Sequence, residues 1–331
     1  MPVSLTVVMP TYNRADYVES CLSSLRDCGV CDMEVVVVDD GSTDETSNRF
    51  ANDTRCLYVR QVNQGPAAAR NHGTSLSRGR YLAFLDCDDR WLAGRARRVV
   101  ELLDAHPNVD AVFTDAQVGN DRDGHASWIE TAGQQAFFEL PYDEPEPGFR
   151  VLHQVPFFRR MACRNVIFIG ALVVRREAFE RSGGFDPTFC GAADWELWMR
   201  MACQMTFGYW PDPLAIYTRH EENMSSHHDS MKSEFARVLA KVLGKCPNLA
   251  SPERTLVRAC LRDMEYGRAW EAYDRGMMHQ ARLLFGHSLR LGGGPTALAY
   301  WVACCFPMRI VRRVRSLKRM CNVLAQMAHS L

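Results

Sequence analysis

The sequence predicts an α/β protein built on a doubly wound, mostly parallel sheet, with a helical C-terminal appendage. Two observations predict the sheet: short apolar runs rich in β-branched or aromatic residues, and helical patterns between them. Strands that alternate with helices form parallel sheets, because each helix returns the chain to the same end of the sheet. From about residue 230 onward only helical patterns occur, which predicts the appendage.

Each predicted strand is short and is followed by turn or acidic residues. In chain order the strands are Leu5–Met9, Glu34–Val38, Tyr81–Leu85 and Ala111–Thr114. The first helix is predicted where apolar side chains between Tyr17 and Leu25 fall at helical spacing. A second is predicted to begin with a capping box, in which Ser42 is the N-cap and Glu45 reaches back. Pro66 fits the first position of a third helix. Residues 116–165 show no clear periodicity.

The composition is that of an ordinary globular protein and argues against a nucleic-acid binder held by bulk charge. Of the 331 residues, 47% are hydrophobic and 24% are charged, and 39 basic residues balance 39 acidic ones. The charge is uneven, because residues 276–331 contain eight basic residues and no acidic one. A basic end of this kind favours an anionic surface as a partner.

The same end contains an apolar run. Thr296–Phe306 is too short to span a bilayer, and six basic residues follow it between 309 and 319. The segment 296–319 is therefore predicted to lie as a basic amphipathic helix on an anionic membrane surface. The alternative is a terminal helix packed on the acidic body of the protein. No nucleic acid is expected as a partner, because the body adds no basic patch or aromatic platform.

Cysteine usage and the N-terminus predict a cytoplasmic protein, peripheral on the cytoplasmic face of a membrane if the basic segment binds lipid. The 13 cysteines are scattered and odd in number, unlike a disulfide scaffold. Cys28 and Cys31 form a lone C-x-x-C whose other zinc ligands are missing, so small buried side chains are expected there. The apolar run Val3–Met9 stops at Pro10 and is too short for a signal peptide.

Polar residues follow the strands where their carboxyl ends are expected to meet, at 10–14, 39–42 and 86–89. Parallel sheets bind ligands in the crevice beyond those ends. Neither a dinucleotide fingerprint nor a phosphate loop is present in the sequence. Asp86 and Asp88, spaced D-x-D, suit a Mg²⁺ or Mn²⁺ ion that leaves positions free for substrate phosphates. The alternative is that these short acidic residues only end a strand and cap a helix.

Several motifs, in their order and spacing, resemble the family-2 inverting glycosyltransferases of the A-type fold. They are Val7–Arg14, Val37–Asp44, Gly65–Asn71, Phe84–Asp89, Gly183–Asp186, Ala193–Trp198 and His220–Ser225. The resemblance covers roughly residues 3–226, about two thirds of the chain. The irregular segment 116–165 matches nothing in this family pattern that would name an acceptor.

The resemblance implies a nucleotide-sugar site. Its candidate residues are Pro10, Thr11, Tyr12, Arg14, Asp39, Asp40, Arg70, Asp86 and His220. One of Asp39 and Asp40 would bond the nucleobase, and the resemblance does not decide between them. Arg70 would lie over the base or the diphosphate.

The resemblance also implies a metal and a general base. Asp88 would ligate a Mn²⁺ or Mg²⁺ ion that bridges the diphosphate, Asp86 would face the ribose or a metal-bound water, and His220 would contact the diphosphate or the metal. Asp194 matches the base that takes the proton from the acceptor hydroxyl. Partial desolvation by Trp195 would make an aspartate a better base. A second, compatible role for Asp194 is the N-cap of the helix that follows.

The implied function is metal-dependent, inverting transfer of a sugar from a nucleoside diphosphate sugar. The acceptor would be a hydroxyl of a saccharide or a lipid-linked molecule, in the synthesis of a cell-surface polysaccharide or glycolipid. The alternative is a catalytically silent nucleotide-sugar or glycan-binding module tethered at a membrane. A nucleotidyltransferase is disfavoured, because its phosphate loop after the first strand is missing.

The implied domain organisation has three parts. They are a glycosyltransferase domain at 1–226 (nucleotide-binding half 1–115, acceptor half 116–226), a helical region at 227–294 and a basic amphipathic tail at 295–331.

Overall fold

The structure is a computed structural model, and it forms two compact units. It describes residues 3–26, 28–29, 32–50, 53–119, 126–131, 135–220, 223, 228–246 and 249–306. One unit comprises Met1–Glu234 with Lys245–Leu249, and the other comprises Phe235–Gly244 with Ala250–Leu331. Cys31 and the predicted basic segment from residue 307 onward lie outside the described residues. The predicted domain boundaries stay predictions.

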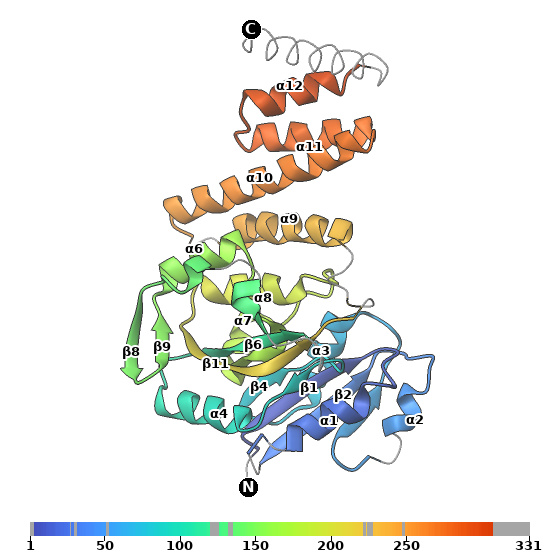
Figure 1. Ribbon diagram of the computed structural model, residues 1–331, viewed down its shortest axis with the longest axis vertical. Coiled ribbons are helices and arrows are strands. Elements are labelled where there is room, and N and C mark those ends of the chain that lie inside the picture. The colour runs from blue at the N-terminus through green and yellow to red at the C-terminus, as the bar shows by residue number, and fades with distance from the viewer. Residues whose placement is uncertain are drawn as a thin grey trace, which may run out of the picture. The chain divides into compact units, whose positions relative to one another are not determined.

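The first unit is built around one mixed sheet (Figure 1). Its strands are β1 (Leu5–Thr11), β2 (Met33–Asp39), β3 (Leu57–Arg60), β4 (Tyr81–Phe84), β5 (Arg90–Trp91), β6 (Ala111–Gly119), β7 (Ala126–Ser127), β8 (Tyr142–Glu146), β9 (Phe149–Leu152), β10 (Leu172–Arg175) and β11 (Phe207–Thr218). The order across the sheet is β3-β2-β1-β4-β10-β6-β11-β9-β8, with β5 paired to β11 and β7 paired to β6. The pairs among β1, β2, β3 and β4 are parallel, as is β6 with β11, whereas β10 runs antiparallel between β4 and β6.

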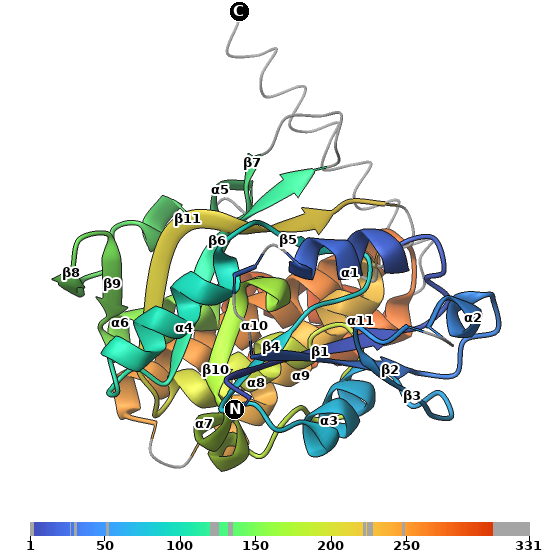
Figure 2. The same ribbon diagram turned by 90° about the horizontal axis from the view of Figure 1, so that it is seen from below.

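Helices cover both faces of this sheet. They are α1 (Val18–Arg26), α2 (Thr46–Phe50), α3 (Pro66–Leu76), α4 (Arg95–Ala105), α5 (Trp128–Thr131), α6 (Gln154–Cys163), α7 (Arg176–Ser182) and α8 (Ala193–Ala202). Figure 2 shows α1 on one side of β1 and β2, and α3 on the opposite side. Gly73 lets α3 lie close to the sheet, because a Cβ there would be 2.5 Å from a methyl carbon of Val8. The doubly wound, mostly parallel sheet is confirmed.

The four predicted strands are all present, but the structure contains strands that the sequence patterns did not indicate. β3 is a half-exposed edge strand without a continuous apolar run. The segment 116–165, which lacks periodicity, contains the end of β6 and the hairpin of β8 and β9, in which β8 is almost wholly exposed. Apolar periodicity reveals a strand only where one face of it is buried, and β3 and β8 have no buried residue.

The prediction of a capping box at Ser42 and Glu45 was wrong. α2 begins at Thr46, and Asp44 Oδ1 accepts a hydrogen bond from the Thr46 backbone N–H at 3.0 Å. The Ser42 hydroxyl instead accepts a hydrogen bond from the Asn13 backbone N–H at 3.0 Å. A contact with the loop after β1 therefore replaces the local cap.

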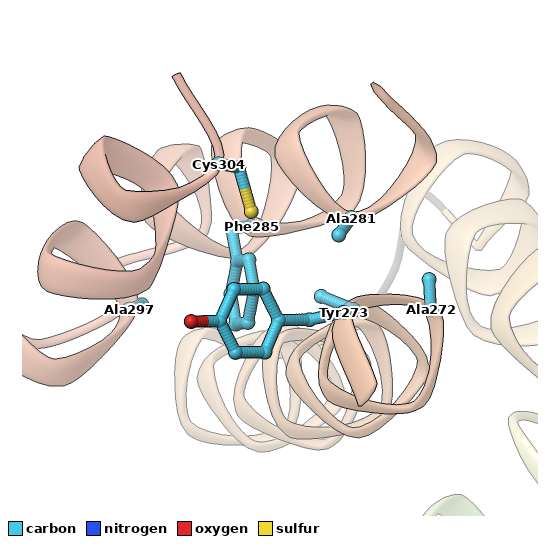
Figure 3. Close-up of a cluster of buried hydrophobic side chains, with 7 residues drawn as sticks. Ala272, Tyr273, Ala281, Phe285, Ala297 and Cys304 are labelled. Carbon is cyan, nitrogen blue, oxygen red and sulfur yellow. The ribbon is translucent and has the colours of Figure 1, made fainter. Parts of the chain in front are cut away.

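The helical appendage is confirmed. Its helices are α9 (His228–Lys245), α10 (Ser251–Asp274), α11 (Met278–Arg290) and α12 (Pro295–Ala303). The last three share a buried cluster that includes Tyr273, Phe285 and Ala297 (Figure 3). Gly276, with φ at +82°, makes the turn between α10 and α11, where a side chain would be strained. Within the ranges that the structure describes, none of the helices is both long and apolar enough to cross a bilayer.

Candidate active site

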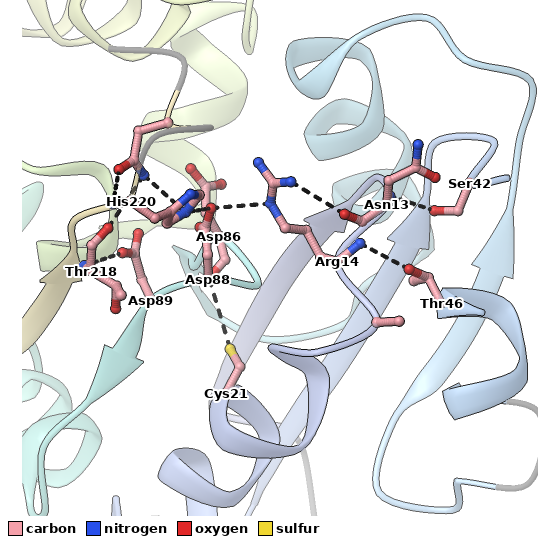
Figure 4. Close-up of polar contacts among 12 residues, drawn as sticks. Asn13, Arg14, Cys21, Ser42, Thr46, Asp86, Asp88, Asp89, Thr218 and His220 are labelled. Atoms are coloured by element: carbon pink, nitrogen blue, oxygen red, sulfur yellow. Dashed lines mark hydrogen bonds and ion pairs between the residues drawn. The ribbon is translucent and has the colours of Figure 1, made fainter. Parts of the chain in front are cut away.

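The loops that follow β1 and β2 are joined by hydrogen bonds. The Asn13 side-chain oxygen accepts from the Thr43 backbone N–H at 2.8 Å. The Arg14 backbone N–H donates to the Thr46 hydroxyl at 2.9 Å (Figure 4). Asn13 has a φ of +52°, a conformation that asparagine tolerates better than most residues. Together with the Ser42 contact, these bonds hold the two loops together beyond the carboxyl ends of β1 and β2.

The carboxylate of Asp39 is fully buried at the end of β2. Its Oδ1 accepts from the Ser42 backbone N–H at 2.7 Å, and its Oδ2 accepts from the Tyr58 hydroxyl at 2.6 Å. Burial and the hydrogen bond to Asp39 raise the pKa of Tyr58. Each carboxylate oxygen of Asp39 therefore accepts a hydrogen bond, one of them from a neutral hydroxyl, and Oδ2 also lies 4.0 Å from Arg60 Nε.

The neighbouring Asp40 organises the loop that leads into α3. Its Oδ1 accepts from the Gln61 side-chain amide at 2.8 Å and from the Gln64 backbone N–H at 2.9 Å. Its Oδ2 accepts from the Gly65 backbone N–H at 2.8 Å. Gly65 has a φ of +87° and directly precedes Pro66, which begins α3 as predicted. Asp40 thus fixes the start of the helix that bears Arg70.

Arg70 and Asp86 form a close ion pair across the crevice. Arg70 Nη2 lies 2.5 Å from Asp86 Oδ1, and the Arg70 side chain is almost completely buried. The guanidinium carbon is 5.5 Å from the centre of the Phe185 ring. The neighbouring Asn71 side chain exchanges two hydrogen bonds with the Phe185 backbone, at 2.8 and 3.0 Å. These contacts join α3, the end of β4 and the Gly183–Asp186 turn.

Asp88 lies between Arg14 and His220. Its Oδ2 is 3.3 Å from Arg14 Nε and 2.9 Å from His220 Nε2 (Figure 4). The imidazole of His220 stacks on the Tyr17 ring, with centroids 5.2 Å apart. Asp89 follows Asp88 in the chain. Burial and the negative charges of Asp88 and Asp86 raise the pKa of Asp89 well above its usual range. The structure therefore brings the predicted residues Arg14, Asp88 and His220 into direct contact.

Asp194 lies in the first turn of α8 and is partly buried. Its Oδ2 accepts a hydrogen bond from the Asn165 side-chain amide at 3.0 Å. Burial raises the pKa of Asp194 to about 6, an effect that the positive charge of Arg70 opposes and the negative charge of Asp86 reinforces. The N-cap residue of α8 is Ala192, so the predicted capping role of Asp194 was wrong. Asp194 is thus more basic than an ordinary aspartate, and its pKa depends on the charges of Arg70 and Asp86.

Three predicted site residues carry a buried polar atom without a hydrogen-bond partner among the described residues. These atoms are Thr11 Oγ1, Arg70 Nε and His220 Nδ1. Pro10 is buried at the end of β1, and Tyr12, next to Thr11, is 45% exposed. Buried polar groups normally have partners, so these three atoms are available for hydrogen bonds to a polar ligand.

Sequence reasoning missed Asn165 and Tyr17 as site residues. Asn165 contacts a residue 29 positions further along the chain, and Tyr17 contacts His220 through its ring. Neither residue belongs to a strand-end acidic motif. In the sequence, Asn165 is marked only as the end of the segment 116–165, which shows no clear periodicity.

Comparisons with known proteins identify the family of the chain. The family model for glycosyl transferase family 2 matches residues 6–166. A PGL/p-HBAD biosynthesis glycosyltransferase of Mycobacterium bovis is 31% identical over 203 residues, which are 59% of this chain and 68% of that protein. The chain belongs to glycosyl transferase family 2. It is therefore a glycosyltransferase of the inverting class, which takes its sugar from a nucleotide sugar.

Other proteins resemble smaller or larger parts of the chain. The protein TuaG of Bacillus subtilis, named for teichuronic acid biosynthesis, is 33% identical over 105 residues, 30% of this chain and 41% of that protein. The structure of S. aureus TarS 1-349 with UDP-GlcNAc has a TM-score of 0.60 at 17% identity, covering 87% of this chain and 81% of that one. The mannosyltransferase PcManGT of Pyrobaculum calidifontis, with GDP-Man and Mn²⁺, has a TM-score of 0.56 at 20% identity, covering 91% and 79%. At these identities the two structures show the shared fold.

The candidate metal ligands of this glycosyltransferase suit a divalent cation that is bound partly by the protein and partly by the substrate. Within the described ranges no three His, Cys, Asp or Glu residues form a group that would hold a metal alone. Asp88 and His220 face each other at 2.9 Å, and the side chain of Asp86 is 34% exposed beside them. Mg²⁺ and similar ions are often held by one or two carboxylates together with substrate phosphates. Asp88, with His220 or Asp86, suits that mode.

The raised pKa of Asp194 predicts a pH-dependent cost to folding. An aspartate in the unfolded chain loses its proton near pH 3.9, whereas Asp194 in the folded protein does so near pH 6. Stability therefore falls as the pH rises through this window, and the cost is complete above about pH 6. We expect Asp194→Asn to increase the free energy of unfolding at pH 7.5 by roughly 1–3 kcal/mol, with a smaller gain at pH 4.5. Urea denaturation at both pH values measures the two gains.

The exposed Asp274 on α10 provides the matched control. Asp274→Asn should change the free energy of unfolding little, and equally at the two pH values. An equal gain for Asp194→Asn at pH 4.5 and 7.5 would contradict the raised pKa.

Proposed function

We propose that this chain transfers a sugar from a nucleoside diphosphate sugar to a hydroxyl group, with a divalent metal ion and with Asp194 as the general base. The acceptor is a saccharide or a lipid-linked molecule, in the synthesis of a cell-surface polysaccharide or glycolipid. The observation that carries the proposal is the placement of Asp194, an aspartate of raised pKa, near the Arg70–Asp86 pair. The names of the relatives from M. bovis and B. subtilis support the class of product.

The donor is a nucleoside diphosphate sugar whose polar groups would satisfy the orphaned atoms of the crevice. Thr11 and Arg70 lie on the side formed by the β1 loop and α3, and His220 lies on the other side. UDP-GlcNAc in TarS and GDP-Man in PcManGT make UDP and GDP sugars the first donors to test. Arg14 and Arg70 supply positive charge toward a diphosphate, which guanidinium groups bind well.

When bound, Mn²⁺ or Mg²⁺ supplies Lewis-acid neutralisation of the charge that develops on the leaving diphosphate. Asp88 and His220 would hold the ion, and Arg70 keeps Asp86 in place. Asp194 takes the proton of the acceptor hydroxyl as that oxygen attacks the anomeric carbon. A base with a pKa of about 6 is mostly unprotonated at neutral pH, yet it is more basic than an ordinary aspartate. Attack from the face opposite the leaving group inverts the anomeric centre.

The metal assignment predicts the behaviour of Asp88→Ala. We expect UDP or GDP to raise the melting temperature of the wild-type protein more with Mn²⁺ than without, because a ligand that binds only the folded state stabilises it. Asp88→Ala should lose the part of the shift that depends on Mn²⁺. Thermal denaturation with UDP, GDP, dTDP and CDP measures the shift that depends on Mn²⁺ and identifies the nucleobase of the donor. The control Asp274→Ala should keep the wild-type shift, and an unchanged shift in Asp88→Ala would remove Asp88 from the metal site.

The base assignment predicts that Asp194→Asn binds the donor and does not turn it over. We expect nucleotide affinity within about twofold of wild type and a fall in kcat of at least about 100-fold, the order expected for loss of a general base. Release of the nucleoside diphosphate from a radiolabelled donor measures turnover. Glu177→Gln, an exposed carboxylate on α7, is the control. Wild-type turnover in Asp194→Asn would show that another group is the general base. If the wild-type protein itself bound the donor and released no nucleoside diphosphate, the silent binding module would be favoured.

We also propose that α12 and the basic segment after it bind an anionic membrane on the cytoplasmic side. Exposed apolar side chains gather at this end of the described chain: Leu298 is 50% exposed, Val302 43% and Phe306 51%. The six basic residues between 309 and 319 follow directly in the sequence. Apolar anchors next to basic residues are typical of segments that bind anionic lipid surfaces.

Sedimentation with vesicles tests the membrane proposal. We expect the full chain to pellet with vesicles that contain anionic phosphatidylglycerol and to remain in solution with neutral phosphatidylcholine vesicles. The double variant Leu298→Ser/Phe306→Ser should pellet less, because it lacks two apolar anchors. Val62→Ser, which removes an 82% exposed side chain in the first unit, should pellet like wild type. Equal pelleting of the double variant and wild type would remove α12 from the binding segment.

A further inference from the structure

The carboxylate of Glu234 binds three consecutive backbone N–H groups. Its Oε1 accepts from Cys190 at 2.9 Å, and its Oε2 accepts from Gly191 and from Ala192, both at 2.8 Å. Glu234 lies in α9 and is the last residue of the main segment of the first unit. A carboxylate that accepts several N–H bonds forms charge-assisted hydrogen bonds, which are stronger than bonds between neutral groups.

These three residues directly precede the helix that bears Asp194. α8 begins at Ala193, and Asp194 is its second residue. In the described structure the N-cap residue Ala192 offers no side-chain cap, so the carboxylate of Glu234 supplies the negative charge that a helix N-terminus favours. Fixing Cys190, Gly191 and Ala192 fixes the backbone from which Asp194 projects.

A second contact from α9 holds the same turn. A Cβ at Gly191 would lie 2.3 Å from Met231 Sδ, so the glycine backbone packs directly against this side chain. Met231 and Glu234 are three positions apart in α9 and therefore lie on one face of the helix. The turn before α8 is thus held by packing and by hydrogen bonds from one helix face.

We propose that Glu234 is a positioning residue for Asp194, an inference that rests on the proposed role of Asp194 as the base. Asn165 orients the carboxylate of Asp194 from one side, and Glu234 sets the backbone that carries it. A displacement of about 1 Å in a reacting group can reduce the rate about 100-fold. Sugar transfer therefore depends on α9, a helix outside the residues that the family model matches.

The proposal is tested by three measurements on the variants Glu234→Ala and Glu234→Gln and on a control variant. The control is Glu177→Ala, the removal of an exposed carboxylate on α7. Hydrogen exchange of the peptide 187–195 reports the N–H bonds, binding of UDP or GDP with Mn²⁺ reports the donor site, and release of nucleoside diphosphate from the sugar donor reports turnover.

We expect faster exchange in the 187–195 peptide of Glu234→Ala, a donor KM within about twofold of wild type and a kcat lowered 10- to 100-fold. Glu234→Gln should be intermediate, because its amide oxygen still accepts hydrogen bonds whereas its NH₂ group faces an N–H donor. A loss of stability alone would weaken donor binding and turnover together. The split between KM and kcat therefore separates positioning from folding.

The outcomes separate this proposal from the proposed function. Unchanged exchange in Glu234→Ala, or faster exchange with wild-type kcat, would overturn the positioning role while Asp194→Asn remains inactive. A parallel loss of donor affinity and kcat would also overturn it, in favour of a role in folding. Wild-type turnover in Asp194→Asn would instead overturn the base assignment on which both proposals rest.

Discussion

The ion pair between Arg70 and Asp86 is the contact on which the site depends. Parallel strands concentrate polar residues at their carboxyl ends, and here this places Asp86, Asp88 and Asp89 close together. Like charges so close are tolerated only if cations or donors face them. Arg70 faces Asp86 from α3, and Arg14 and His220 face Asp88. Burial, together with the charges of Asp88 and Asp86, raises the pKa of Asp89. Arg70 also packs on Phe185 and acts electrostatically on Asp194. One guanidinium thus connects α3 with Asp86, Phe185 and, electrostatically, Asp194.

The two sides of the crevice are stabilised by different means. On the donor side, hydrogen bonds between the loops after β1 and β2 fix the backbone, and Asp40 fixes the entry to α3. On the other side, Asp194 is held in a position that costs folding free energy when it is charged, because burial raises its pKa. Active sites commonly combine a rigid frame with one destabilised group. Burial of such a carboxylate raises its pKa and, when the carboxylate is charged, lowers the free energy of unfolding. Asn165 and the turn held by Glu234 keep that group in place.

The sequence predicted four strands of the sheet, β1, β2, β4 and β6, and the polar residues that follow the first three, because both depend on local patterns. Apolar runs mark buried strands, and the residues that follow them must meet at one edge of a parallel sheet. Arg14, Asp88 and His220 meet as expected. The edge strands β3 and β8 were missed because little of their surface is buried. Asn165 and Glu234 were missed for another reason: their partners lie 29 and 42 to 44 positions away, so no local spacing records the contact. The cap expected at Ser42 failed because a partner in another loop replaced the local one.

The hydrogen bonds of Asp39 and Asp40 bear on which of them contacts a nucleobase. Both side chains are buried, so a base N–H can bond to either carboxylate only by using a remaining lone pair or by displacing a present donor. Asp40 accepts two backbone N–H groups and a side-chain amide, and losing these would release the start of α3 and with it Arg70. Asp39 accepts one backbone N–H and the hydroxyl of Tyr58, and Arg60 Nε lies 4.0 Å from its Oδ2. Displacing a neutral hydroxyl costs less than releasing a helix start, and Asp39 is therefore the better candidate for the base contact.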